Sequence, residues 1–140
     1  MYIIIIGCGK VGLSLAEQLR DENHDITLVD SSADKLQNLS DDLDVMKVLG
    51  NGASISTLQD ASIERADILI AVTGSDELNL LCCLIAKKAG HVSTIARVRN
   101  PIYNKEIDFI RESIGLSMII NPELAAATEI SRILRFPSAI

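Results

Sequence analysis

The first twelve residues of the chain place the strongest constraint on its fold. Residues 2–6 (Tyr-Ile-Ile-Ile-Ile) form a short apolar run, and its β-branched composition is typical of a strand buried on both faces. Gly7, Gly9 and Gly12 follow in G-x-G-x-x-G spacing, and apolar residues then recur at helical spacing over 11–19. A strand, a glycine loop and a helix in this order predict the first βα unit of a dinucleotide-binding fold.

Each glycine of this loop has its own expected role. Gly7 makes the tight turn off the strand, Gly9 lets the backbone approach a pyrophosphate, and Gly12 lets the helix lie close to the sheet. The helix N-terminus that follows presents unsatisfied N–H groups and a positive dipole end, which suit a diphosphate. The alternative is a tight turn in an α/β domain that binds nothing.

Asp30 is the second expected ligand contact. Residues 26–29 (Ile-Thr-Leu-Val) predict a strand, and Asp30 ends it. A carboxylate at this point can accept hydrogen bonds from the ribose hydroxyls of an adenosine. The alternative makes Asp30 the cap of the next helix, but Ser31 and Ser32 are available for capping.

The rest of the chain alternates apolar runs with helical segments. We expect further strands near 45–49, 68–72, 93–98 and 117–120, and helices near 32–42, 54–61, 76–89, 101–113 and 122–135. This alternation predicts an α/β fold with a doubly wound parallel sheet (Rossmann), six strands in the order 3-2-1-4-5-6. Loops 7–12, 30–32, 50–52 and 73–76 would then meet at the carboxyl edge of the sheet.

Composition narrows the class of protein. The 140 residues fit a single Rossmann-type domain over 1–140, with a terminal crossover helix within 120–140. A net charge of −6 argues against nucleic acid as a partner, and the absence of an apolar run of ~20 residues argues against membrane insertion. No basic leader precedes the first strand, so we expect a cytoplasmic protein.

The three cysteines and two histidines point to neither a metal nor a catalytic site. Cys82 and Cys83 are neighbours on an expected helix and lack metal-ligand spacing. Cys8 lies near a helix N-terminus, which would lower the pKa of its thiol, so a redox role is the alternative to a reduced, inert thiol. His24 and His91 precede strands and therefore belong at the amino edge, away from a ligand.

The chain resembles the N-terminal nucleotide-binding domain, of the KTN or RCK type, of the TrkA family of Trk potassium-uptake regulators. The resemblance covers the whole chain and rests on IIIGCGKVG, DITLVD, LGNGA, ADILIAVTGSDELN, IARVR and NPE. The first two segments occur in many Rossmann folds, whereas the run with Thr73, Asp76 and Asn79 and the Arg97-Val-Arg99 segment are more specific.

The resemblance implies where a ligand binds. The phosphates would be cradled by Gly7, Cys8, Gly9, Lys10 and Val11, and the ribose would be held by Asp30. The adenine would be flanked by Asn51 and Gly52. The point where the strand order reverses would be lined by Val72, Thr73 and Gly74, and Arg97 would reach a phosphate or the distal nucleotide. Gly12, Ser31 and Asn79 are included in the expected site. An arginine fork suits phosphate, although Arg97 and Arg99 are alternatively solvated partners in salt bridges.

The resemblance also implies a function. It indicates a cytoplasmic regulatory domain that binds NAD(H), or alternatively ATP/ADP, and gates a membrane potassium transporter subunit to which it is peripherally attached. Full-length members are longer, so the chain would correspond to their N-terminal domain. The apolar stripe in 122–135 predicts a homodimer or a higher ring, the alternative being a helix that folds back on its own sheet. The competing function is the cofactor-binding half of an NAD-dependent dehydrogenase, but no catalytic acid is found near the four loops, so we expect no enzyme.

Overall fold

A computed structural model describes residues 1–121 of the chain. The expected helix over 122–135, and with it the predicted crossover, lies outside the described residues. The strands are β1 Tyr2–Ile6, β2 Asp25–Asp30, β3 Met46–Leu49, β4 Ile68–Ala71, β5 Ser93–Arg97 and β6 Met118–Ile120. The helices are α1 Lys10–Asp21, α2 Ala33–Gln37, α3 Ile55–Asp60, α4 Asp76–Ala89 and α5 Ile107–Ile114, with short 3-10 helices at Ile63–Arg65 and Pro101–Glu106.

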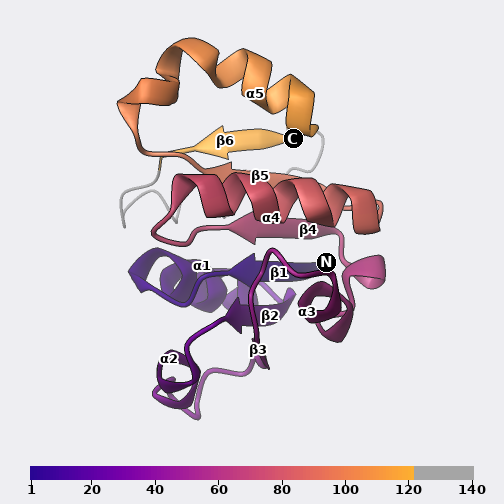
Figure 1. The fold of residues 1–140 in the computed structure, drawn as a ribbon. Helices are drawn as coiled ribbons and strands as arrows, with labels where there is room; N and C mark the ends of the chain where they lie inside the picture. Colours follow the sequence, from indigo (N-terminus) through magenta and orange to yellow (C-terminus); the bar gives the residue numbers. More distant parts are fainter. Residues whose placement is uncertain (122–140) are drawn as a thin grey trace.

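The six strands form one parallel sheet in the order β3-β2-β1-β4-β5-β6. This order confirms the predicted doubly wound Rossmann topology. The strand arrows point to the left in Figure 1, so the carboxyl ends of the strands lie together at that edge. The order reverses between β1 and β4, where the loops after these strands separate and leave room for a ligand.

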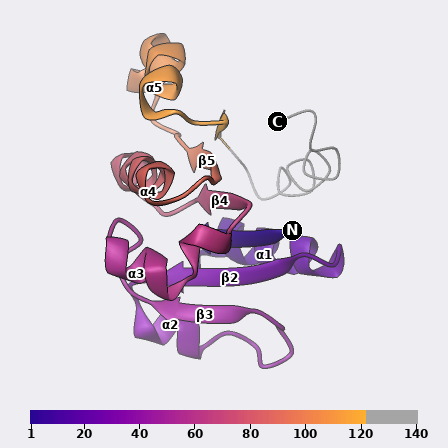
Figure 2. The ribbon, with the colours of Figure 1, turned by 90° about the vertical axis from the view of Figure 1, so that its right-hand side faces the viewer.

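Alternate residues of β1 enter two hydrophobic cores. Ile3 and Ile5 pack with the apolar side of α1, including Leu15 and Leu19, and with α2. Ile4 and Ile6 pack instead with α3 and α4. The two helices α1 and α4 thus lie on opposite faces of the sheet (Figure 2). Burial of both faces explains why β1 and β4 are unbroken apolar runs.

Helix α2 is shorter than the sequence predicted. It ends at Gln37, whereas the apolar spacing indicated a helix to Asp42. Ser40 Oγ accepts a hydrogen bond from Asp42 N at 3.2 Å, and such local bonds of Ser, Asn and Asp compete with helix continuation. Leu39 and Leu43 are nevertheless buried, as the spacing required.

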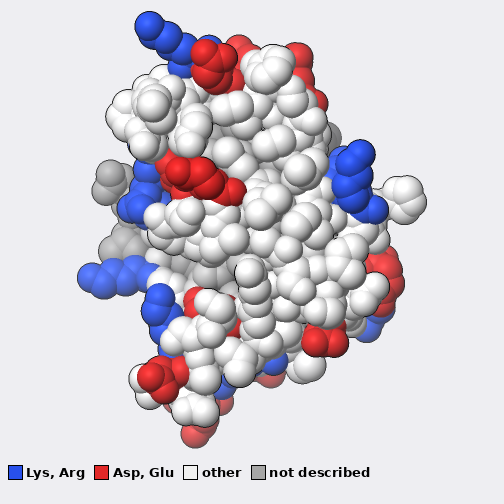
Figure 3. Space-filling model, in the orientation of Figure 1, with Lys and Arg blue, Asp and Glu red and all other residues white. Residues whose placement is uncertain are grey.

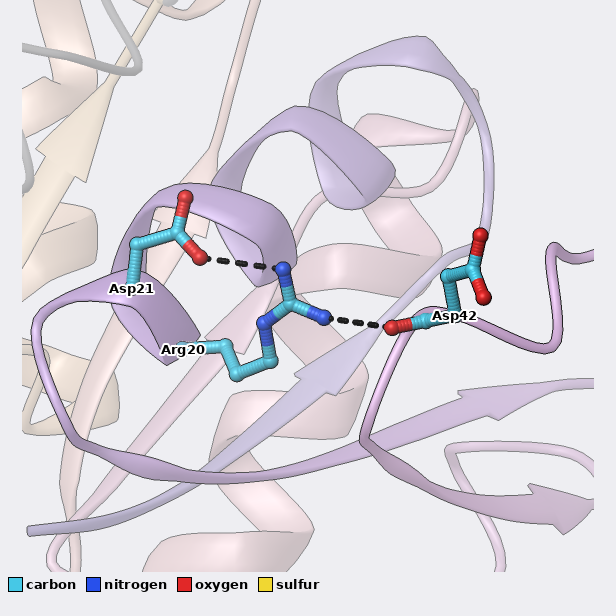
Figure 4. A network of polar contacts seen from close by, with 3 residues as sticks. All are labelled: Arg20, Asp21 and Asp42. Atoms are coloured by element: carbon cyan, nitrogen blue, oxygen red, sulfur yellow. Dashed lines mark hydrogen bonds and ion pairs between the residues drawn. The ribbon is translucent and has the colours of Figure 1, made fainter.

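The segment after α2 is tied to the end of α1. Arg20 Nη1 donates to the carbonyl oxygen of Asp42 at 2.9 Å, and Arg20 Nη2 lies 2.9 Å from Asp21 Oδ1 (Figure 4). The guanidinium thus holds the irregular chain that leads into β3 against the first βα unit.

The sequence also predicted one helix from Pro101 to about Ser113, and the structure divides it. Pro101–Glu106 is a 3-10 helix and Ile107–Ile114 is the α-helix α5. Asn100 Oδ1 accepts from Ile102 N at 3.0 Å and caps the first turn. Gly115, at φ +78°, ends α5 in the left-handed conformation typical of a helix C-terminus.

Candidate functional site

A cleft of about 370 Å³ lies at the carboxyl edge of the sheet, where the loops after β1, β2, β3 and β4 meet. Thirteen of the predicted site residues line it: Gly7, Cys8, Gly9, Lys10, Val11, Asp30, Ser31, Asn51, Gly52, Val72, Thr73, Gly74 and Arg97. Ile6, Val29, Lys35, Gly50 and Leu78 complete the lining. The predicted site residues Gly12 and Asn79 are not among the lining residues, because both are buried beneath it.

The glycine loop has the geometry that the fingerprint requires. Gly7 has φ +111°, a conformation that side chains disfavour, and its amide donates to Val29 O at 2.8 Å. A Cβ on Gly12 would collide with the carbonyl oxygen of Gly7, so Gly12 allows α1 to lie against the loop. A Cβ on Gly9 would meet nothing within 4 Å, which leaves the backbone open toward the cleft.

Asp30 links two walls of the cleft. Its Oδ2 accepts a hydrogen bond from Cys8 N at 2.8 Å, and its Oδ1 accepts one from Ser32 N at 2.8 Å. The capping function for α2 belongs to Ser32, whose Oγ accepts from Lys35 N at 3.3 Å. Asp30 therefore sits at the tip of β2 facing the cleft, and it is also a structural acceptor for both adjoining loops.

The loop after β3 forms the next part of the cleft. Asn51 Oδ1 accepts from Ala53 N at 2.9 Å, which closes a local turn. A Cβ on Gly52 would collide with Ile6 Cγ2, so the absence of a side chain lets this loop approach the end of β1. The loop expected to flank an adenine is thus packed directly beside the glycine loop.

The cleft is locally positive although the chain is acidic. Among the described residues that line it, three carry positive charge (Lys10, Lys35 and Arg97) and one, Asp30, carries negative charge. The chain as a whole has a net charge of −6. Figure 3 shows lysine and arginine side chains along the left edge, which is the carboxyl edge of the sheet. Positive charge around a concave site raises the local concentration of anions.

The alternative considered for Cys8, a thiol pKa lowered by the helix N-terminus, is wrong. Burial raises the pKa of the Cys8 thiol, and the neighbouring Asp30 carboxylate raises it further. These effects outweigh Lys35 and Lys47, which act in the opposite direction. A thiol with a raised pKa is a poor nucleophile at neutral pH, so the redox alternative for Cys8 loses its basis.

His24 lies at the amino edge, as predicted, far from a catalytic arrangement. His24 Nδ1 lies 3.1 Å from the amino group of Met1, at the opposite end of β1 from the cleft. Burial lowers the pKa of His24, and the Met1 amino group lowers it further. Within residues 1–121 no group of three His, Cys, Asp or Glu side chains could hold a metal ion, and no helix is both long and apolar enough to cross a membrane.

Sequence reasoning did not include Lys35 and Leu78 among the site residues. Both lie near the start of a helix that follows a site loop, α2 for Lys35 and α4 for Leu78. A signal for them exists, because the first turn of such a helix borders the carboxyl edge of the sheet. Sequence spacing alone does not say which side chains of that turn point toward the ligand.

Residues 3–122 match the family model for the TrkA-N domain. The chain is 41% identical over 140 residues to a Trk system potassium uptake protein TrkA homolog of Archaeoglobus fulgidus, a match that covers all of this chain and 32% of that protein. It is 36% identical to a homolog of Methanothermobacter thermautotrophicus, covering 98% of this chain and 62% of that one. The chain therefore spans less than two thirds of the length of these relatives.

Solved structures agree with these matches. The TrkA-N domain of the inner membrane protein ybaL from Escherichia coli is 25% identical, with a TM-score of 0.75 over 95% of this chain and 96% of that one. The GsuK channel bound to NAD is 22% identical, with a TM-score of 0.73 over 86% of this chain and 21% of that one, and it bears on the fold alone. The family model, the relatives and the Rossmann sheet with its glycine-loop cleft lead to one conclusion: this chain belongs to the TrkA-N domain family.

Proposed function

We propose that the chain is the nucleotide-binding regulatory domain of a potassium transport system. It binds NAD(H), or alternatively ATP/ADP, in the cleft, and the ligand-dependent change of conformation gates a membrane potassium transporter subunit. One observation carries the proposal: loops from four strands converge on a positively charged cleft that contains the glycine loop, the N-terminus of α1 and the Asp30 carboxylate.

The residue roles follow from the position of each group in the cleft. The open backbone at Gly9 and the N–H groups at the start of α1 would receive the phosphates, with Lys10 adding positive charge. Asp30 would accept from the ribose hydroxyls, since each of its oxygens keeps a further acceptor site besides its backbone hydrogen bond. Arg97 at the end of β5 would meet a more distant phosphate or the second nucleoside.

The proposal includes no catalysed reaction. Hydride transfer needs a substrate pocket with a general acid, and the described lining of the cleft offers Lys10, Lys35, Arg97 and the doubly hydrogen-bonded Asp30 as its charged groups. The relatives whose names refer to Trk potassium uptake point in the same direction. The domain would then act as a ligand-controlled switch in the cytoplasm, peripheral to the inner membrane through its transporter partner.

Calorimetry of the chain against NADH, NAD, ATP and ADP tests the proposal, together with an assay for NADH oxidation by simple 2-oxo acids. We expect saturable binding of at least one of these nucleotides and no turnover. Steady consumption of NADH in proportion to protein would favour the dehydrogenase half instead. Absence of binding by all four ligands would refute the nucleotide-binding role.

The proposal extends to self-association. The sequence of 122–135 carries an apolar stripe of Leu124, Ala127, Ile130, Ile133 and Leu134, outside the described residues. A homodimer or ring of like domains would cover it. We expect light scattering at tens of micromolar to show a dimer and Ile130→Glu to reduce it, while a wild-type monomer together with a normally folded Ile130→Glu variant would refute the dimer.

A further inference from the structure

One buried side chain, Asn79, holds the turn between β4 and α4 without reaching the cleft. It is fully buried, at 0% exposure. Its Oδ1 accepts hydrogen bonds from Thr73 N at 2.8 Å and Thr73 Oγ1 at 2.6 Å. Its Nδ2 donates to Thr73 O at 3.2 Å and to Arg97 O at 2.9 Å. Every donor and acceptor site of the amide is therefore used inside the protein.

These hydrogen bonds join two strands beyond the end of their ladder. The β4–β5 pairs run from Ile68 opposite Ser93 to Ala71 opposite Ala96. Thr73 and Arg97 follow these last pairs, and both line the cleft. Asn79 thus fixes the separation of the two groups that form the β4–β5 side of the site.

The β4–β5 side is the far end of the cleft from Asp30. Asp30 ends β2, and the strand order β2-β1-β4-β5 places Arg97 three strand spacings away. At about 4.8 Å per spacing this separation is roughly 14 Å. A mononucleotide held by its ribose at Asp30 ends before that side, whereas a dinucleotide extends to it.

We propose that Asn79 is a positioning residue that gives the cleft its preference for a dinucleotide over a mononucleotide. Its amide holds Thr73 and Arg97 where the distal phosphate and second nucleoside would lie. Asn is suited to this place because the site needs an acceptor for Thr73 and two donors for main-chain carbonyl oxygens from one uncharged group. The inference rests on the proposed function and adds to it the residue that reads the second half of the ligand.

The test compares NADH and AMP on the 140-residue chain. The chain contains no tryptophan whose emission could report binding, so NADH binding is followed by the fluorescence of NADH itself. AMP binding is measured by its competition with NADH. We expect Asn79→Ala to lower the affinity for NADH by about tenfold or more and the affinity for AMP by less than about threefold. Asn79→Ser, which keeps one polar group near Thr73, should show the same direction with a smaller loss. Circular dichroism confirms which variants are folded at the temperature of the titrations.

Asp76→Ala is the matched control on the same helix. Asp76 is 7% exposed, its carboxylate oxygens accept from Arg99 N at 3.0 Å and Asn100 N at 2.7 Å, and it does not line the cleft. Its loss should lower thermal stability yet change the NADH-to-AMP affinity ratio by less than about twofold.

The possible outcomes separate this inference from the function beneath it. Three results would each overturn the role of Asn79. The wild-type chain could bind NADH no more tightly than AMP, or the NADH-to-AMP affinity ratio could stay unchanged in both Asn79 variants. The third result is a change of this ratio in Asp76→Ala as large as that in Asn79→Ala. A wild-type chain that binds neither ligand would instead overturn the proposed nucleotide binding.

Discussion

The carboxylate of Asp30 accepts a hydrogen bond from the backbone nitrogen of Cys8 at 2.8 Å, across 22 positions of sequence. The bond connects the tip of β2 to the glycine loop, so the group expected to hold the ribose is fixed by the loop expected to hold the phosphates. The second oxygen accepts from Ser32 N at the same distance. The two subsites are therefore positioned relative to each other before any ligand arrives, which lowers the entropy cost of binding.

We expect Asp30→Ala to weaken NADH while leaving NADPH binding equal or improved. The carboxylate gains charge-assisted hydrogen bonds to ribose hydroxyls worth roughly 1.5–3 kcal/mol each. A 2′-phosphate in the same place meets a like charge, and one such pair at about 4 Å costs about 4 kcal/mol at an effective dielectric constant of about 20, less where solvent reaches it. Calorimetry with both cofactors measures the difference, and equal weakening of both would make Asp30 purely structural.

Lys35 supplies the control for that substitution. It lines the cleft with Asp30, lies in α2, the helix that follows this strand end, and is a cation available to a 2′-phosphate once the carboxylate is gone. Asp30→Ala combined with Lys35→Ala should therefore lose any gain in NADPH affinity. If NADPH binds the double variant as tightly as it binds Asp30→Ala, Lys35 does not face the phosphate.

Gly12→Ala and Gly9→Ala should separate stability from binding. A Cβ at position 12 collides with Gly7 O, so Gly12→Ala should lower the free energy of unfolding by about 1–3 kcal/mol, measured by urea denaturation. A Cβ at position 9 meets nothing within 4 Å and points into open space. Gly9→Ala should therefore lower the free energy of unfolding by less than about 1 kcal/mol but weaken nucleotide binding. The reverse pattern would contradict the assignment of Gly9 to close ligand approach.

Arg97 and Arg99 should differ in their effect on binding. Arg97 lines the cleft and donates from Nη1 to Val72 O at 3.4 Å, whereas Arg99 lies outside the cleft and donates from Nη2 to Gly74 O at 3.1 Å. Arg97→Ala should therefore weaken NADH binding by about tenfold, with a smaller effect at high salt, and should weaken the binding of ADP, which ends before the β4–β5 side, by less than about threefold. Arg99→Ala should change both affinities by less than about threefold, and a larger loss in Arg99→Ala than in Arg97→Ala would reverse the two roles.

The buried cysteines of α4 should make stability fall at alkaline pH. Burial raises the pKa of Cys82 from 9.0 to about 12, and burial together with Cys82 raises the pKa of Cys83. Above pH 9.0 the unfolded chain releases protons that the folded chain keeps, so the stabilisation is complete below that pH and is lost as the pH rises toward the folded values. Between the unfolded and the folded pKa, each thiol therefore lowers the free energy of unfolding by about 1.4 kcal/mol for each unit that the pH rises.

Urea denaturation at about pH 8 and about pH 10 checks this dependence. Cys82→Ala removes one of the titrating thiols, so its free energy of unfolding should change less between the two pH values than that of the wild type. An identical change in both proteins would assign the alkaline loss to other groups.

The parts of the fold that sequence predicted well are those with local signals. The glycine spacing and the apolar run before it predicted the first βα unit, and α4 spans Asp76–Ala89 as expected because Ser75 caps its start and Gly90 follows its end. The strand order followed from the alternation of strands and helices together with the fingerprint on the first strand. Fifteen residues were predicted for the site, and thirteen of them line the cleft.

By itself the sequence determined the topology, the glycine loop and the strand ends that meet in the cleft, because each depends on spacing within one segment or on handedness rules for neighbouring segments. Only the tertiary structure decided that Asp30 bonds to Cys8, that Lys35 lines the cleft and that Asn79 lies buried between Thr73 and Arg97. These relationships join residues from different strands and helices, and a hydrogen bond forms or fails over a few tenths of an ångström. Sequence periodicity places a side chain on a face of its element, but the distance to a partner on another element depends on how the whole sheet and its helices pack.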